Sequence, residues 1–328
     1  MIRSVILLFC LAGAARADVA AEAESLSRAG TAAVIAIWTP DETEIAVAGR
    51  HTADGPEAIR ADAWHVGSLT KAMTATLAAR LVDDNMIRWD TRAGELLSDA
   101  GNCASVTLSE WLTHRSGMAA NLSAWSTLLD PDRAGYVDAM LATEPEGARG
   151  DFLYSNAGYV IAGSMLEAAT GEAWETLIAR EVFEPLGMAG AGFGPPAGIA
   201  GHGPFGLPVV MDNIAAMGPA GTVHVPPNAM LRFLAAHATR DPGYLPDDLW
   251  TRLHEPVGDY AMGWGVMDGA LSHSGSNTFW YARIRIVSNR AVFVAVNGSG
   301  EAAAQETAQV VSRLAEPVLP AMPAAPRP

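Results

Sequence analysis

The sequence is poor in cysteine and in positive charge, and both shortages exclude classes of protein. Only Cys10 and Cys103 are cysteines among its 328 residues, and Cys10 lies in a segment that we expect to be removed. Cys103 is then alone, so no intramolecular disulfide can form, and we interpret it as a buried structural thiol. The formal net charge of −15 argues against binding to nucleic acid or to anionic membranes.

Several motifs are also missing. There is no Gly-rich phosphate loop, no His or Glu pair at metal-ligand spacing, and no internal repeat. No apolar stretch after the first residues is long enough to span a bilayer. We therefore expect no metal or organic cofactor and no stable membrane insertion. The 50% hydrophobic content predicts a large core, in one composite domain or two small ones.

The two ends of the chain differ from the rest. Residues 1–17 have the pattern of a signal peptide: Arg3 supplies a positive start, residues 5–13 are apolar, and Ala15 and Ala17 form a small-x-small cleavage site. Cleavage near Ala17 predicts a periplasmic or secreted protein. Residues 317–328 contain five prolines, and we expect a disordered tail there.

Strand patterns occur near both ends of the chain, with helical patterns between them. The strand patterns cover residues 31–38, 43–48, 261–267, 279–287 and 291–297, and the first two predict an antiparallel hairpin. Residues 301–315 predict a closing helix. This order predicts an α+β fold, with an antiparallel sheet built from both chain ends, flanked by helices, and a mostly helical insertion. We expect one domain over residues 18–316, in which 18–86 and 256–316 form the α/β part and 87–255 the helical part. The seam between these parts is where a pocket commonly forms.

The run Ser68-Leu69-Thr70-Lys71 places a hydroxyl and an amine one helical turn apart. Residues at i and i+3 share a helix face, so the Lys71 amine can reach the Ser68 oxygen. Gly67 allows a tight turn just before, and the residues up to Asp84 favour a helix. Ser68 is therefore expected in the first helical turn, where free N–H groups favour negative charge. Ser-x-x-Lys is too short a motif to indicate a catalytic site by itself, so other catalytic residues have to be found elsewhere in the sequence.

A second candidate is Tyr154-Ser155-Asn156, just before a predicted helix over residues 157–170. A phenol near a lysine ammonium can be held as phenolate. Tyr154 could then take the proton of Ser68 or return it to a leaving group. Asn156 carries a donor and an acceptor, enough to orient a lysine and bind a substrate amide. Whether Lys71 or Tyr154 is the general base stays open.

A third candidate is His273-Ser274-Gly275-Ser276, at the start of the predicted strand pair 279–287 and 291–297. Gly275 would let a substrate lie against the strand edge, with Ser274 and Asn277 as further substrate contacts. The Ser276 N–H could join that of Ser68 to hold an oxyanion. His273 would supply a donor facing the site, for a substrate carboxylate or for proton transfer.

Together these motifs resemble the serine β-lactamase and penicillin-binding-protein superfamily, whose signature is Ser-x-x-Lys, Tyr-x-Asn and Lys-Thr-Gly or His-x-Gly in this order. The segment Leu112–Met118 is similar to the family's Leu-Thr-His-x-Ser-Gly, which we interpret as structural support. The resemblance implies an acyl-enzyme on Ser68. Tyr at the start of the middle triplet, and no Glu-x-x-Leu-Asn segment after it, point to the class C-like branch, which includes DD-carboxypeptidases, D-amino-acid peptidases and esterases.

Within that branch, His273 stands where class C β-lactamases carry lysine. This departure favours a hydrolase of D-Ala-D-Ala-type peptides or small esters, with a small molecule or short peptide as its partner. A class C-like β-lactamase and a non-catalytic penicillin-binding sensor or scaffold are the alternatives. The sequence does not decide the oligomeric state.

Overall fold

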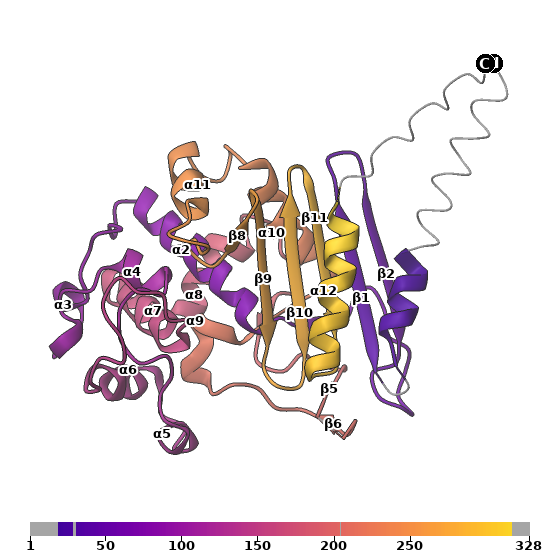
Figure 1. Ribbon diagram of the computed structural model, residues 1–328, viewed down its shortest axis with the longest axis horizontal. Coiled ribbons are helices and arrows are strands. Elements are labelled where there is room, and N and C mark those ends of the chain that lie inside the picture. The colour runs from indigo at the N-terminus through magenta and orange to yellow at the C-terminus, as the bar shows by residue number, and fades with distance from the viewer. Residues whose placement is uncertain (1–18, 29–30, 204, 317–328) are drawn as a thin grey trace.

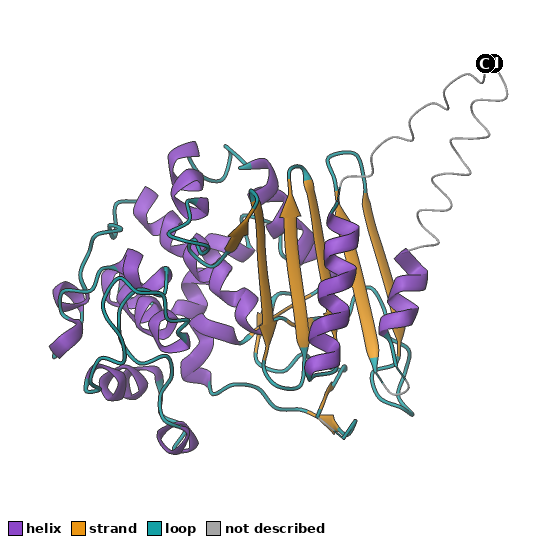
Figure 2. Cartoon of the chain, in the orientation of Figure 1, coloured by secondary structure: helices purple, strands orange, loops and turns teal. Residues whose placement is uncertain are grey.

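The structure is a computed structural model that describes residues 19–28, 31–203 and 205–316. The predicted signal peptide and the predicted tail lie outside the described residues. The main feature is a six-stranded antiparallel sheet with helices around it (Figure 2). In sheet order the strands are β2 (Thr43–Gly49), β1 (Ala32–Trp38), β11 (Arg290–Val296), β10 (Tyr281–Val287), β9 (Ala270–Ser276) and β8 (Gly265–Met267).

The middle of this sheet joins the two ends of the chain. β1 pairs antiparallel with β11, with Ala33 opposite Val296 and Trp38 opposite Ala291. β1 also pairs with β2 in the predicted hairpin. The prediction of an antiparallel sheet from both chain ends is confirmed.

Alternation along the central strands gives the sheet two apolar faces, because successive side chains point to opposite sides. Ala33, Ile35 and Ile37 pack with the helix over residues 19–26 and with α12 (Glu301–Ala315). These two helices cover one face of the sheet in Figure 1. Val34 and Ala36 belong to the larger core on the other face, where α10 (Pro227–Thr239) contacts β1 and β11.

Most of the helices lie between β2 and β8 in the sequence. They are α2 (Thr70–Asp83), α3 (Ala93–Leu96), α4 (Leu108–Leu112), α5 (Ala124–Leu128), α6 (Arg133–Leu141), α7 (Asn156–Thr170), α8 (Trp174–Ile178), α9 (Gly218–Gly221), α10 and α11 (Asp247–His254). Shorter helical turns are η1 (Gly67–Leu69), η2 (Gly101–Cys103), the π-helical η3 (Ala179–Phe183) and η4 (Ala215–Met217). Two small sheets hold β3 (Trp64–His65), β7 (Val223–Val225) and β4 (Gly192–Phe193), and β5 (Gly201–His202) with β6 (Pro208–Val209).

β9 departs from the sequence prediction. His273 to Ser276 were expected at the start of the strand pair 279–287 and 291–297, but they belong to a separate strand, Ala270–Ser276, between β8 and β10. Its polar run Ser272–Ser276 lacks the apolar alternation that marks a strand. The strand predicted at residues 261–267 is shorter, covering only Gly265–Met267.

Cys103 is fully buried and free, as the sequence predicted, and burial raises the pKa of its thiol to about 11. Such a thiol is not a nucleophile at neutral pH.

No helix within the described part of the chain is long and apolar enough to cross a membrane.

The fold depends on a close approach at Gly263, which has φ +80°. A Cβ atom at this position would lie 2.5 Å from the Ala72 Cα on α2. Gly263→Ala combines left-handed strain with overpacking, so we expect its free energy of unfolding to fall by about 1–3 kcal/mol more than that of Gly269→Ala. Gly269 is the matched control because it has φ +75° and open space around it. Urea denaturation of both variants tests this, and equal losses would contradict it.

Candidate active site

Ser68 lies in the 3₁₀-helical turn η1, which continues directly into α2. Gly67 has φ +50°, and a Cβ atom there would lie 2.5 Å from the Ser276 amide nitrogen. A Cβ atom on Gly275 would lie 2.7 Å from the Ser68 amide nitrogen. Glycine at both positions therefore lets the Ser68 turn pack against the end of β9.

The amine of Lys71 is completely buried and contacts three separate segments. Its Nζ lies 3.0 Å from Ser68 Oγ, 2.7 Å from Asn156 Oδ1 and 2.8 Å from the Ala220 carbonyl. The two carbonyl oxygens can only accept, so they take two N–H bonds. The third position on nitrogen faces the Ser68 hydroxyl, which can donate to an uncharged amine.

Burial controls the charge of Lys71. Desolvation lowers the pKa of Lys71 to about 7, from an ordinary value of 10.5. The rings of Tyr154 and Tyr159 flank the amine, with centroids 5.0 and 5.6 Å from Nζ. A large fraction of Lys71 is thus uncharged near neutral pH and able to accept a proton.

Tyr154 and Asn156 are placed by the start of α7. Between them, Ser155 caps the helix, since its Oγ accepts the Gly158 N–H at 2.8 Å. The Asn156 Nδ2 donates to Asn121 at 2.7 Å, so this side chain is held at both of its polar atoms. Asn156 is therefore well placed to orient Lys71.

The sequence prediction of a Tyr154 phenolate does not agree with its surroundings. Tyr154 is 36% exposed, but desolvation of its phenol raises the pKa of Tyr154 to about 12, although the neighbouring Ser68 hydroxyl lowers it somewhat. The phenol is therefore protonated at neutral pH. It can donate a proton, and Lys71 is the better acceptor in the resting site.

The His114 ring packs against the ring of Tyr154. It is buried, its Nδ1 accepts the Ser155 N–H at 3.0 Å, and its ring lies 4.4 Å from that of Tyr154 between centroids. Desolvation holds the pKa of His114 well below its usual range. These contacts fit the structural role that the sequence predicted for the segment Leu112–Met118.

His273 lies in the same pocket, but its ring is occupied by internal contacts. Its Nδ1 lies 2.7 Å from the Ser274 carbonyl, and its Nε2 lies 3.0 Å from the Tyr260 hydroxyl. A carbonyl only accepts, so Nδ1 carries the proton and Nε2 receives the Tyr260 O–H. Burial, with the nearby Lys71 charge, lowers the pKa of His273 to about 3. The imidazole is uncharged at neutral pH and has no free donor for a substrate, unlike the role expected from the sequence.

The edge of β9 near Ser68 is open. β8 pairs only with residues 270–272, while residues 273–276 extend beyond it. Along this edge Ser274 is half-buried and Ser276 is exposed, while Gly275 is buried against η1. Asn277 is buried and donates to Asp212 at 3.1 Å, so it supports the strand end and does not face a substrate.

These residues enclose a pocket of about 480 Å³. Its wall includes Ser68, Tyr154, Tyr260, His273, Ser276 and Arg283. Tyr260 and Arg283 were not predicted, because neither lies in a recognisable motif and only folding brings them to the pocket. No cluster of metal-ligating side chains occurs in the described ranges.

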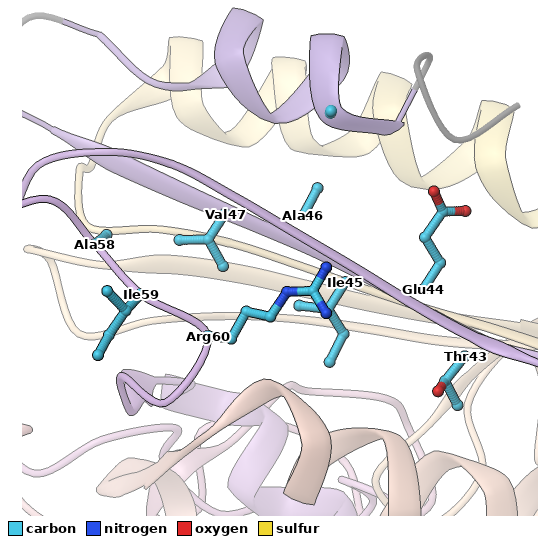
Figure 3. Close-up of a pocket in the computed structure, with 9 residues that line it drawn as sticks. Thr43, Glu44, Ile45, Ala46, Val47, Ala58, Ile59 and Arg60 are labelled. Atoms are coloured by element: carbon cyan, nitrogen blue, oxygen red, sulfur yellow. The ribbon is translucent and has the colours of Figure 1, made fainter. Parts of the chain in front are cut away.

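A larger cavity of about 710 Å³ lies along the edge strand β2 (Figure 3). Its walls are mostly aliphatic, with Thr43, Glu44 and Arg60 as polar side chains. It contains no hydroxyl next to a lysine or histidine. The smaller pocket at Ser68 is therefore the candidate active site, on its chemistry and not on its size.

Comparison with known proteins identifies the family of the chain. The sequence model of a family described as Beta-lactamase matches residues 16–316. Penicillin-binding protein 4 of Amycolatopsis lactamdurans is 26% identical over 302 residues, covering 79% of this chain and 78% of that protein. An unguisins hydrolase of Aspergillus violaceofuscus is 31% identical over 172 residues, which are 47% of this chain but only 30% of that hydrolase. The chain thus spans less than a third of the hydrolase's length.

Among solved structures, a D-alanine carboxypeptidase from Burkholderia cenocepacia has a TM-score of 0.77 at 19% identity. The match covers 92% of this chain and 99% of that one, and it supports the shared fold. Since the family match extends over most of the sequence, the chain belongs to the Beta-lactamase family.

Proposed function

We propose that this protein is an exported serine hydrolase that acts through an acyl-enzyme on D-Ala-D-Ala-type peptides or small esters. The observation that carries the proposal is the 3.0 Å contact between Ser68 Oγ and a buried amine that is largely uncharged at neutral pH. Export rests on the signal-peptide pattern of residues 1–17, with the hydrolase domain over 18–316.

Acylation begins when Lys71 takes the Ser68 proton and the oxygen attacks the substrate carbonyl. The oxyanion is held by the backbone N–H groups of Ser68 and Ser276, which adjoin where η1 packs on β9. Tyr154 gives its proton to the leaving group, and the proton on Lys71 restores the phenol. Water then hydrolyses the ester on Ser68 with the same groups acting in reverse.

His273 and Asn156 act indirectly in this scheme. The imidazole of His273 fixes the Tyr260 hydroxyl beside the pocket, and Asn156 orients the Lys71 amine. Neither supplies a cation for a substrate carboxylate. The class C-like β-lactamase alternative therefore gains no support from His273, where that branch carries lysine.

Arg283 favours a substrate with a carboxylate. It lines the pocket from β10, opposite Ser274 in the strand register. Its one hydrogen-bond partner within the described residues is the Tyr281 hydroxyl, at 2.9 Å, and none of their carboxylates pairs with it. A guanidinium without an anion suits the terminal carboxylate of a peptide.

Ser68→Ala removes the nucleophile, so we expect hydrolysis of a chromogenic ester to fall at least about 10³-fold and labelling by fluorescent penicillin to disappear. Ser276→Ala is the matched control: it keeps the backbone N–H assigned to the oxyanion and should retain activity within a few fold. Circular dichroism checks that both variants fold. Full hydrolytic activity in Ser68→Ala would end the proposal.

The charge of Lys71 can be measured directly because it is the only lysine in the sequence. Labelling with lysine carrying ¹³C at Cε gives one resonance, and we expect it to titrate near pH 7 in the folded protein and near 10.5 in urea. The ester kcat/KM should rise with pH through 7 and then level off, since the uncharged amine is the base. The unfolded chain keeps the proton up to about pH 10.5, so the free energy of unfolding should rise between pH 7 and 10.5. A folded-state midpoint above pH 9 would contradict this assignment.

Arg283→Ala tests the substrate class. We expect KM for a peptide ending in D-Ala-D-Ala to rise about 10-fold or more, because a hydrogen bond to a charged group is lost. KM for the same peptide with an amidated end, and for an uncharged ester, should change less than about threefold. Arg285→Ala is the control, since Arg285 lies two residues along β10 and outside the pocket wall. Equal effects on acid and amide peptides would refute the carboxylate role.

A further inference from the structure

The two proposed oxyanion donors belong to different parts of the chain. Ser68 is in the turn η1, and Ser276 is at the end of β9, more than two hundred residues later. Their N–H groups must point at one oxygen, because misplaced donors stabilise an oxyanion poorly. Some contact has to hold both elements in register.

One series of contacts between the two elements starts at Gly67. Its N–H donates to Nδ1 of His65 at 3.1 Å, and the His65 side chain is fully buried. Because Nδ1 accepts, the imidazole proton lies on Nε2. Nε2 in turn lies 2.7 Å from Oδ1 of Asp212, a close His–carboxylate contact whose angle is not that of a hydrogen bond. The left-handed turn before Ser68 is thus connected to a carboxylate through one imidazole.

A second series of contacts connects Asp212 to the end of β9. The Nδ2 of Asn277 donates to the same Oδ1 of Asp212 at 3.1 Å. The Oδ1 of Asn277 accepts the N–H groups of Phe279 and Trp280, each at 3.2 Å. These hydrogen bonds fix the position of the backbone directly after Ser276.

The segment carrying Asp212 is also attached beside the base. The next residue, Asn213, donates from Nδ2 to the Gly221 carbonyl at 2.7 Å. Gly221 follows Ala220, whose carbonyl accepts from Lys71. Asp212 is therefore held firmly between the nucleophile turn, the strand end and the base.

Asp212 has the character of a functional group and not only of a packing residue. Its side chain is 6% exposed, and its second oxygen, Oδ2, is buried without a hydrogen-bond partner in the described part of the chain. An unpaired buried carboxylate oxygen lowers stability, and such costs are concentrated at functional sites.

We infer that Asp212 is a positioning residue for the oxyanion hole: through His65 and Asn277, one carboxylate fixes the two N–H donors relative to each other. This inference rests on the proposed function, since it assumes that Ser68 and Ser276 hold the oxyanion. Asp212 does not touch the substrate, so its loss should lower kcat and leave KM nearly unchanged.

The chain provides a matched control for this pair. His51 and Asp62 also lie 2.7 Å apart, with side chains 12% and 11% exposed. This second pair is outside the pocket wall. Asp62→Ala therefore removes an equivalent His–Asp contact and reports on general destabilisation alone.

The test compares Asp212→Ala, Asp212→Asn, Asn277→Ala and Asp62→Ala with wild type, using a chromogenic ester and a fluorophosphonate that labels the catalytic serine. We expect Asp212→Ala to lower kcat and the labelling rate together by about 10–100-fold, with KM within threefold and the ¹³C lysine titration still near pH 7. Asn277→Ala should act in the same direction, and Asp212→Asn, which keeps an oxygen acceptor, more weakly. Asp62→Ala should stay within threefold of wild type.

His65→Phe adds a coupling test. If His65 and Asp212 act in series, the double variant His65→Phe/Asp212→Ala should be no slower than the worse single variant, because the connection is broken only once. The inference is overturned if Asp212→Ala or both Asp212→Asn and Asn277→Ala keep wild-type rates, or if Asp62→Ala falls equally. Wild type that neither hydrolyses the ester nor labels with the phosphonate would instead refute the proposed function.

Discussion

The burial of one amine is the constraint on which the site depends. The Lys71 nitrogen needs hydrogen-bond partners, and these lie on the turn η1, on the first residue of α7 and on α9. An ammonium in this place would be costly, so burial favours the uncharged amine. The packing that satisfies Lys71 is therefore the same packing that suits it to the proposed role of base next to Ser68.

The two parts of the molecule contribute different chemistry. The helical part supplies Tyr154 and Asn156 on one capped helix start, and the sheet supplies the backbone edge of β9. β8 is short, and this leaves the edge open beside Ser68. The proposed oxyanion hole thus depends on how closely η1 and β9 approach, which the glycines at 67 and 275 permit.

Local features of the site were predictable, but features that depend on tertiary surroundings were not. The i, i+3 spacing of Ser68 and Lys71 acts within one turn, so the sequence was sufficient to pair them. The other two motifs were placed by resemblance, because no local rule brings them together. The charge states of Tyr154 and His273 depend on burial and on Tyr260, which spacing does not report.

The same distinction applies to the fold. The hairpin of β1 and β2 and the helix α12 have clear apolar periodicity, and the structure places them as predicted. β9 carries too many serines to show a strand pattern, although it forms one wall of the pocket. Asp212 had no motif at all, since its partners are distant in sequence.

The pairing of β1 with β11 has a consequence for biosynthesis. β1 cannot gain its central neighbour until residues 290–296 have left the ribosome, because that neighbour is β11. Ser276 emerges shortly before. A nascent chain therefore carries Ser68 long before the β9 wall of its pocket has been made, and the pocket is complete only after these late strands have emerged.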